Sequence, residues 1–216
     1  EEKRVVLQTA KFAPPGDGLG EYAAGVKSAL AGLAERDIVA RIWRKDHTVW
    51  KPDPTEIANR LGWLTVSDIM SEGAPALQAF AGEIRDGDFR HVVLLGMGGS
   101  SLGAEVLRQT FGSAPGYPEL IVLDSTVPAS VLSVPRAIDP AKTLFLVSSK
   151  SGSTTEPNYL YRYFRSLVES AAGKEGAGLT FVAITDAGSS LAGLAVEEGF
   201  RHTFLNPPDI GGRYSV

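Results

Sequence analysis

The chain has 216 residues, of which 44% are hydrophobic and 21% are charged, and its formal net charge is −4. These proportions are typical of an ordinary globular protein with one large domain or two small ones. The negative charge gives no electrostatic reason to expect a nucleic acid or an anionic membrane as partner. No apolar run is long enough for a membrane-spanning helix.

The chain contains no cysteine and only three scattered histidines. The lack of cysteine excludes disulfides and a cysteine metal cluster, and isolated histidines do not indicate a zinc site. We therefore expect no metal, and a reducing, cytoplasmic location fits this composition. The chain begins with Glu and stops at "GGRYSV", so we also expect a fragment of a larger protein.

The first ninety residues have a helical pattern. Apolar residues recur at helical spacing in 21–37, 37–50 and 74–88, and Gly87 is expected to end the last of these helices. The stretch 54–63 (PTEIANRLGW) can also start a helix, with Pro54 in its first turn. Three tryptophans on these apolar faces are predicted to be core residues: Trp43, Trp50 and Trp63.

From His91 onward the pattern changes to short apolar runs separated by helical stretches. The runs are 92–95, 120–123, 143–147, 180–184 and 202–205. Continuous apolar strands that alternate with helices indicate a parallel sheet covered on both faces. We predict an α/β fold with a doubly wound five-stranded parallel sheet in residues 90–216. A helical N-terminal segment, residues 1–89, is expected to pack on it.

Four loops should lie beyond the carboxyl ends of the strands, where such sheets bind ligands. They read GMGGSSLG (96–103), DSTVP (124–128), SSKSGSTTEP (148–157) and TDAGSS (185–190), and each contains Ser or Thr. Hydroxyls and backbone amides at helix N-termini favour an anion, so a phosphate is the expected ligand. Helix capping would explain one hydroxyl of the 148–157 loop, but three within six residues indicate a binding site.

The first loop partly matches a dinucleotide-binding motif. Asp124 follows the second strand, where an acid that binds a ribose would lie. However, a G-x-G-x-x-G motif that starts at Gly96 and Gly98 has Ser101 in place of its third glycine. An NAD-dependent enzyme is therefore the less favoured alternative. The chain also has no G-x-x-x-x-G-K-[ST] motif, which disfavours a P-loop ATPase.

The same loop contains a literal G-x-S-x-G motif, Gly99 to Gly103. In an α/β-hydrolase the serine follows its strand directly, whereas Ser101 lies about six residues beyond the end of the predicted strand. Asp186 and His202 follow in the order of a catalytic triad, but His202 lies within a predicted strand. We interpret this match as accidental.

The loops together resemble those of the sugar isomerase (SIS) fold, and within it the glucose-6-phosphate isomerase family. The resemblance covers roughly residues 90–216 and rests on LLGMGGSSLGAEVL, LDST, SSKSGSTTEP and the run into GGRYS. The N-terminal part, with RIWRKDHTVW and IANRLGWL, resembles bacterial fusions of transaldolase and glucose-6-phosphate isomerase. The resemblance implies an enzyme of glycolysis and gluconeogenesis that interconverts glucose 6-phosphate and fructose 6-phosphate through an enediol(ate).

The resemblance also implies site residues. Ser149, Ser151 and Thr154 match hydroxyls that hold the sugar's phosphate, with the amide of Lys150 nearby. In the first loop, Ser100 with Gly98 and Gly99 matches the part that faces the substrate. Gly212 and Arg213 match the G-G-R signature, whose arginine stabilises the enediolate, as a fixed guanidinium can. Pro157 replaces a threonine that binds phosphate in the family.

In the family, the proton-transferring glutamate, the ring-opening histidine and a late lysine all follow the G-G-R signature. This chain has three residues after Arg213, so we expect it to bind the phosphate without isomerising the sugar. Glu156 is interpreted as a first-turn acid, not as the catalytic base. No cofactor is implied, because general acid–base groups suffice, and the intact protein is expected to be a homodimer. A non-catalytic sugar-phosphate-binding SIS module of a regulator remains the alternative.

Overall fold

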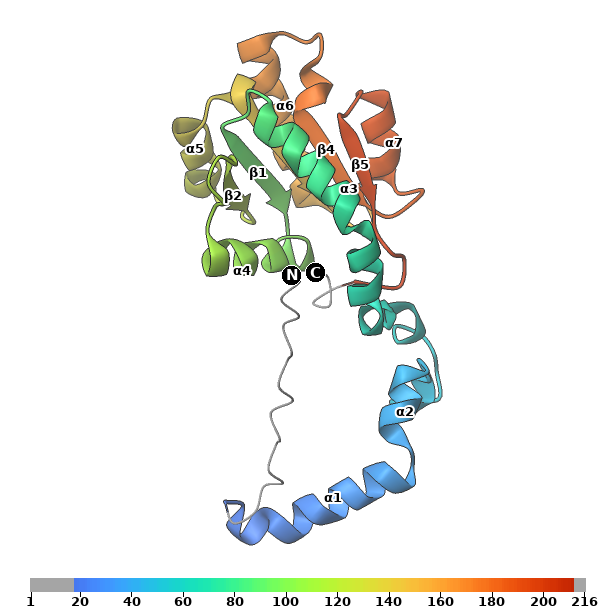
Figure 1. The fold of residues 1–216 in the computed structure, drawn as a ribbon. Coiled ribbons are helices and arrows are strands. Elements are labelled where there is room, and N and C mark those ends of the chain that lie inside the picture. The colour runs from blue at the N-terminus through green and yellow to red at the C-terminus, as the bar shows by residue number, and fades with distance from the viewer. Residues whose placement is uncertain (1–17, 212–216) are drawn as a thin grey trace, which may run out of the picture. The chain divides into compact units, whose positions relative to one another are not determined.

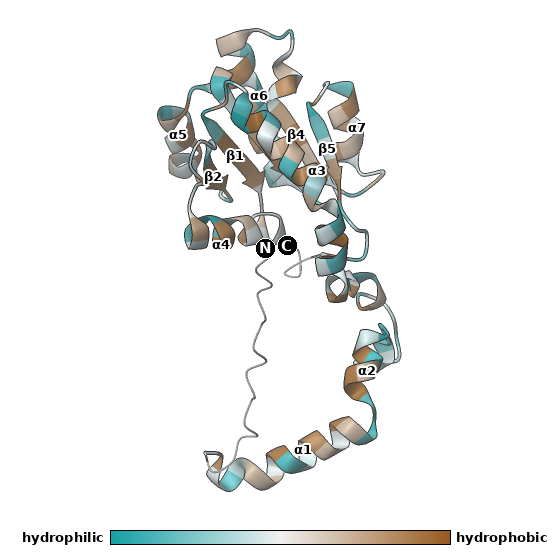
Figure 2. Ribbon diagram, in the orientation of Figure 1, coloured by the Kyte–Doolittle hydropathy of each residue, from teal (hydrophilic) through white to brown (hydrophobic). Residues whose placement is uncertain are grey.

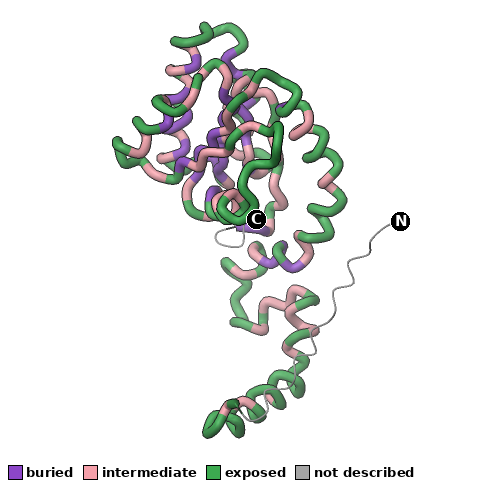
Figure 3. The backbone as a smooth tube through the Cα atoms, turned by 60° about the vertical axis from the view of Figure 1, so that its left-hand side comes forward, coloured by how far each residue is buried: buried purple, intermediate pink, exposed green. Residues whose placement is uncertain are grey.

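The computed structural model describes residues 18–211. The chain divides into two units that meet between Pro54 and Thr55. The first unit contains helices α1 (Ala23–Glu35) and α2 (Ile38–Trp43), with 3-10 turns at Gly20–Tyr22 and His47–Val49. None of the residues of α1 is buried, as its exposed colouring in Figure 3 shows.

The second unit is built on one sheet of five parallel strands. In chain order they are β1 (His91–Gly96), β2 (Glu119–Leu123), β3 (Thr143–Ser148), β4 (Phe181–Thr185) and β5 (His202–Leu205). Their order across the sheet is β2-β1-β3-β4-β5, and every neighbouring pair is parallel. The predicted doubly wound five-stranded sheet is therefore confirmed (Figure 1).

Helices cover both faces of this sheet. They are α3 (Val66–Asp86), α4 (Leu102–Phe111), α5 (Pro128–Ala137), α6 (Thr155–Ala172) and α7 (Ser190–Glu197). Short 3-10 turns span Ala58–Arg60, Gly62–Leu64, Gly98–Ser100, Pro140–Lys142 and Ala177–Thr180. The strands are the most hydrophobic part of this unit (Figure 2), as expected for a sheet buried on two sides.

Alternate residues of the strands serve two separate clusters. On one face, Phe145 stacks between Phe164 of α6 and Phe181 of β4, with ring centroids 5.1 Å apart in both pairs. Residues of α5, α6 and α7 complete this larger cluster. On the other face, Ile84 of α3 packs with Leu144, the next residue to Phe145 in β3. The sheet is thus the middle of three layers.

Helix α3 extends the sheet unit beyond the predicted limits. The sequence predicted a helix within 74–88, and α3 begins earlier, at Val66, and continues through Pro75. Gly87 caps its end, as predicted. Helix α3 supplies the second helical layer and belongs to the sheet unit, which begins at Thr55. The division into 1–89 and 90–216 stays a prediction.

In the N-terminal part, one helical prediction was wrong and another was too long. The stretch 54–63 forms turns instead of an α-helix, and Glu56 there has a left-handed φ of 58° that a helix does not accept. The helix predicted over 37–50 is α2 alone, because Lys45 also has a left-handed φ, of 58°. The tryptophans predicted in the core are exposed: Trp43 by 62%, Trp50 by 48% and Trp63 by 38%.

Candidate functional site

The two predicted substrate loops follow β1 and β3, the neighbouring strands between which the chain reverses the direction in which it adds strands to the sheet. From β1 the chain crosses to β2 on one side, and β3 lies on the other side of β1. Gly96 and Ser148, the last residues of β1 and β3, are paired in register. Loops 97–101 and 149–154 therefore leave the sheet side by side, at the topological switch point where doubly wound sheets bind ligands.

Loop 149–154 carries a connected set of hydroxyls. The Ser149 hydroxyl donates a hydrogen bond of 3.3 Å to the Thr154 hydroxyl, which links the first and last residues of the loop. Ser149 is buried, at 5% exposure, whereas Thr154 is exposed. The hydroxyls of Ser151 and Ser153 share a second hydrogen bond of 2.8 Å. These four groups can each turn their protons toward an anion bound above the loop.

Helix α6 begins directly after this loop, at Thr155. Thr154 occupies the N-cap position, yet its side chain caps none of the described amides of the first turn. The unpaired amides of a first turn and the helix dipole together favour an anion. Glu156 lies in this first turn, as predicted. Pro157, also in the first turn, has neither an N–H nor a hydroxyl, so this helix lacks both donors of the threonine that the family pattern implies there.

Two further contacts fix the shape of loop 149–154. The Asn158 side-chain amide donates to the carbonyls of Gly152 and Thr154, at 3.0 and 2.9 Å. Gly152 is buried with a φ of +70°. An added Cβ there would meet the backbone nitrogen of Leu191 and lie 2.8 Å from Ser190 Oγ. The loop is therefore packed tightly against the N-terminus of α7.

The Lys150 side chain connects loop 149–154 with the loops that follow β4 and β5. Its Nζ lies 2.6 Å from Asp186 Oδ2 and donates to the Pro208 carbonyl at 2.9 Å. Asp186 in turn donates its backbone N–H to the Lys150 carbonyl at 3.1 Å. The strand ends of β3, β4 and β5 are thus tied together, and the positive charge of Lys150 is paired.

The first loop turns sharply back over the end of β1. Gly98 has a φ of +58°, and the turn Gly98–Ser100 brings the Ser100 carbonyl to 2.7 Å from the position of a Cβ on Gly96. Ser101 is buried at 2% exposure, and its hydroxyl donates to the Gly98 carbonyl at 3.1 Å. Ser101 is thus a structural residue, while Gly98, Gly99 and Ser100 form the surface of the turn at the switch point.

The serine-hydrolase alternative does not fit this arrangement. His202 begins β5, at the amino edge of the sheet, and its ring lies against Phe80 and Phe204. Ser101 and Asp186 follow the opposite, carboxyl ends of their strands. The three residues therefore cannot form a triad, and Asp186 is already paired with Lys150.

The two signature residues Gly212 and Arg213 lie outside the described residues. The segment that leads to them, Asn206 to Gly211, follows β5 at the same edge of the sheet as the loops. Asn206 donates its N–H to Thr185 at 2.9 Å, and Pro208 accepts from Lys150. The assignment of Arg213 to the enediolate stays a prediction.

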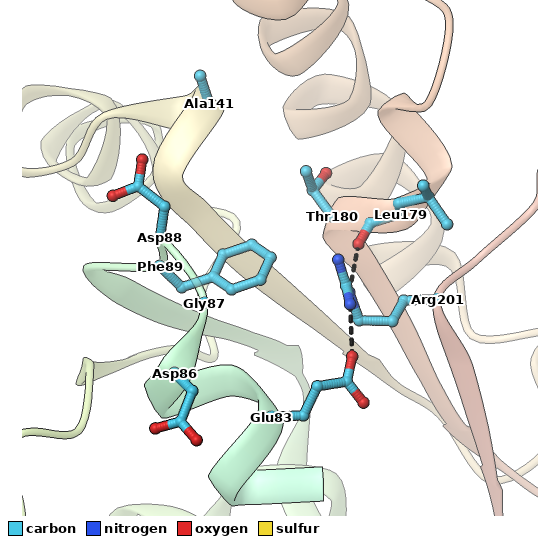
Figure 4. A pocket seen from close by; sticks show the side chains of 9 residues that line it. All are labelled: Glu83, Asp86, Gly87, Asp88, Phe89, Ala141, Leu179, Thr180 and Arg201. Carbon is cyan, nitrogen blue, oxygen red and sulfur yellow. Dashed lines mark hydrogen bonds and ion pairs between the residues drawn. The ribbon is translucent and has the colours of Figure 1, made fainter.

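A surface cavity of about 460 Å³ lies at the opposite, amino edge of the sheet. Its lining residues precede β1, β3, β4 and β5 or end α3, as Figure 4 shows. Arg201 lines it and is held by Glu83 at 2.6 Å and by the Leu179 carbonyl at 2.7 Å. Because that arginine is already paired and the loops lie at the other edge, we do not place the site in this cavity.

Residues 18–211 contain no group of three His, Asp or Glu side chains that could hold a metal ion. None of the helices described is long and apolar enough to cross a membrane.

The sequence interpretation missed two structural partners of the loop. The sequence pattern indicates Asp186 only as a candidate triad acid and assigns no role to Asn158, whereas the structure pairs Asp186 with Lys150 and Asn158 with the Gly152 carbonyl. The polar TDAGSS loop signalled that Asp186 lies at the ligand edge, but its ion pair with Lys150 joins residues 36 positions apart. Asn158 carried a local signal, since an amide one turn into a helix can reach back to the preceding loop.

Comparisons with known proteins agree with this geometry. The family model "Phosphoglucose isomerase" matches residues 67–216. The glucose-6-phosphate isomerase of Staphylococcus saprophyticus is 37% identical over 166 residues, which are 72% of this chain and 36% of that protein. The Staphylococcus aureus (strain Newman) enzyme is 39% identical over 132 residues, 58% of this chain and 29% of that protein. The chain thus spans about a third of the length of these relatives.

Two solved structures are also similar. A hypothetical protein from Thermus thermophilus superposes with a TM-score of 0.68 at 27% identity, over 90% of this chain and 44% of that one. A glucose-6-phosphate isomerase from Chlamydia trachomatis superposes with a TM-score of 0.59 at 28% identity, over 81% of this chain and 31% of that one. The family model covers more than half of the chain, including α3 from its second residue, the sheet and both loops. The chain therefore belongs to the phosphoglucose isomerase family.

Proposed function

We propose that this chain forms the phosphate-binding part of an aldose–ketose isomerase that interconverts glucose 6-phosphate and fructose 6-phosphate. The observation that carries the proposal is the hydroxyl-lined loop 149–154 at the uncapped N-terminus of α6, beside the first loop at the switch point. Family membership supplies the reaction class.

The phosphate group would bind where the loop donors converge. Ser149, Ser151 and Thr154 supply hydroxyl protons, and the Lys150 amide and the first turn of α6 supply N–H groups. Each hydrogen bond to a charged group contributes about 1.5–3 kcal/mol. A few such bonds hold a dianion in water-exposed surroundings, and the tight contact of Gly152 with α7 keeps the loop in the required shape.

The sugar would then extend from this phosphate toward the first loop and the segment after β5. Gly98, Gly99 and Ser100 line one side, and Gly212 and Arg213 are proposed to face the reacting carbons. The Arg213 guanidinium would stabilise the oxyanion that develops as a proton moves between C2 and C1. This proton transfer needs only general acid–base groups, so the proposal includes no cofactor.

The remaining expectations are proposals about the whole protein. We propose a cytoplasmic homodimer in glycolysis and gluconeogenesis, with a transaldolase domain fused upstream. Since the chain spans about a third of its curated relatives, we propose that it binds the sugar phosphate without completing the isomerisation. Binding is therefore the appropriate readout for this chain.

Isothermal titration of the 216-residue chain with glucose 6-phosphate tests the proposal. The double variant Ser149→Ala/Thr154→Ala should bind at least about 100-fold more weakly, since it loses two hydrogen bonds to a charged group. The matched control is Thr110→Ala/Ser170→Ala, which also removes one threonine and one serine hydroxyl; both bond only carbonyls of their own helices. Equal affinity of the loop variant and the control, or binding of NAD⁺ that sugar phosphates do not displace, would refute the proposal.

A further inference from the structure

Arg60 lies near the Lys150 side chain of loop 149–154, although the two residues are far apart in the sequence. The position of a Cβ on Gly211 lies 3.2 Å from Arg60 Nη1 and also 3.2 Å from Lys150 Cδ. The guanidinium and the lysine side chain therefore flank the same point, one residue before Gly212. All three residues belong to the unit that begins at Thr55.

The turn that carries Arg60 is held firmly in this place. The Gly62 N–H donates to the Asp209 carbonyl at 2.9 Å. Gly62 is buried, and a Cβ on it would lie 2.7 Å from Ile210 Cγ1. Leu61 and Leu64 on either side are 4% and 7% exposed. The turn that carries Arg60 is thus held by Gly62 against Asp209 and Ile210, in the segment that leads to Gly212.

The two cations at this point differ in their charge balance. The Lys150 ammonium is paired with Asp186 at 2.6 Å. By contrast, none of the carboxylates in residues 18–211 forms an ion pair with the half-buried Arg60. The donors of loop 149–154 are neutral hydroxyls and amides. Within residues 18–211, Arg60 therefore supplies a positive charge beside loop 149–154 that no carboxylate of this range neutralises.

We propose that Arg60 is a substrate-binding residue whose guanidinium contacts the phosphate group of the sugar phosphate held by loop 149–154. A guanidinium binds phosphate through two parallel hydrogen bonds and remains charged at all physiological pH values. The inference rests on the proposed function, because it assigns Arg60 to the same phosphate. It adds a cation to a site otherwise made of neutral donors.

The test compares Arg60→Gln with wild type by isothermal titration, using glucose 6-phosphate and inorganic phosphate separately. The loss of charge-assisted hydrogen bonds should weaken the binding of both ligands by roughly 10- to 100-fold. The salt dependence of binding should also become flatter, because one cation is removed. The control is Arg136→Gln, which removes an exposed arginine in the last turn of α5, at the end of the helix remote from the loops.

The outcomes separate this inference from the proposed function. If Arg60→Gln binds both ligands like wild type while Ser149→Ala/Thr154→Ala loses affinity, Arg60 is not a ligand and the proposed function stands. If Arg60→Gln weakens glucose 6-phosphate but not inorganic phosphate, the contact with the phosphate group is wrong. If wild type binds neither ligand, both proposals fail. Arg60→Met serves as the second variant should Arg60→Gln not fold, and the same criteria apply to it.

Discussion

Gly152 gives a sharp test of how loop 149–154 is built. Its φ of +70° is a left-handed conformation, and a Cβ there would overlap the backbone nitrogen of Leu191 and lie 2.9 Å from Leu191 Cβ. Alanine in the left-handed region costs about 1–2 kcal/mol. The overlap adds about 1–3 kcal/mol, the usual penalty of overpacking, since a helix N-terminus cannot move as freely as a side-chain end.

Gly188→Ala separates these two contributions. Gly188 has a similar φ of +73°, but no atom lies within 4 Å of an added Cβ. Urea denaturation should therefore show a loss of about 1–2 kcal/mol in the free energy of unfolding for Gly188→Ala. Gly152→Ala should lose about 1–3 kcal/mol more.

The Gly152→Ala variant should also bind glucose 6-phosphate more weakly, because the loop must move away from α7. The reasoning is refuted if the two variants are equally stable, or if Gly152→Ala is destabilised by the expected amount while its affinity stays unchanged. The first result would show that α7 yields to the side chain. The second would show that the shape of the loop does not control phosphate binding.

Two further predictions concern the ion pair of Lys150 and Asp186 at the loop edge and Tyr161 of α6, whose ring packs against Phe181 and Phe200. The ion pair of Lys150 and Asp186 is partly exposed. A double-mutant cycle with Lys150→Met and Asp186→Asn should therefore give a coupling free energy of about 1 kcal/mol, which falls with added salt. A coupling free energy of zero at low salt would contradict the pairing. Burial raises the pKa of Tyr161 to about 12, and the unfolded value is near 10. The folded state then holds the proton longer, so stability should fall as pH rises from 10 toward 12, and Tyr161→Phe should reduce that fall in pH-dependent denaturation.

The sheet could be predicted because its signal is local. Each strand is a short apolar run bounded by polar loops, and the runs are separated by stretches with helical spacing. The parallel arrangement and the ligand edge then follow from general rules of α/β proteins. The two loops at 96–103 and 148–157 are therefore predictable from the sequence alone, and the structure brings them to neighbouring strand ends.

The remaining features depend on contacts between distant residues. The ion pair of Lys150 with Asp186 requires that β3 and β4 be neighbours, which their sequences do not state. Arg60 gave no signal, because the turn that carries it was predicted as a helix and is fixed by Asp209, far along the chain. The left-handed Glu56 and Lys45 also went unrecognised, since neither residue type favours that conformation.

The segment between β5 and Gly211 contains neither helix nor strand, yet it is fastened from two directions. Gly62 holds Asp209 by its backbone, and Lys150 holds the carbonyl of Pro208. Proteases cut where a stretch of backbone can detach and adopt an extended form. Because it is held at both residues, this segment should resist proteolytic cleavage in the folded protein despite its irregular conformation. It should keep a fixed conformation and not act as a hinge.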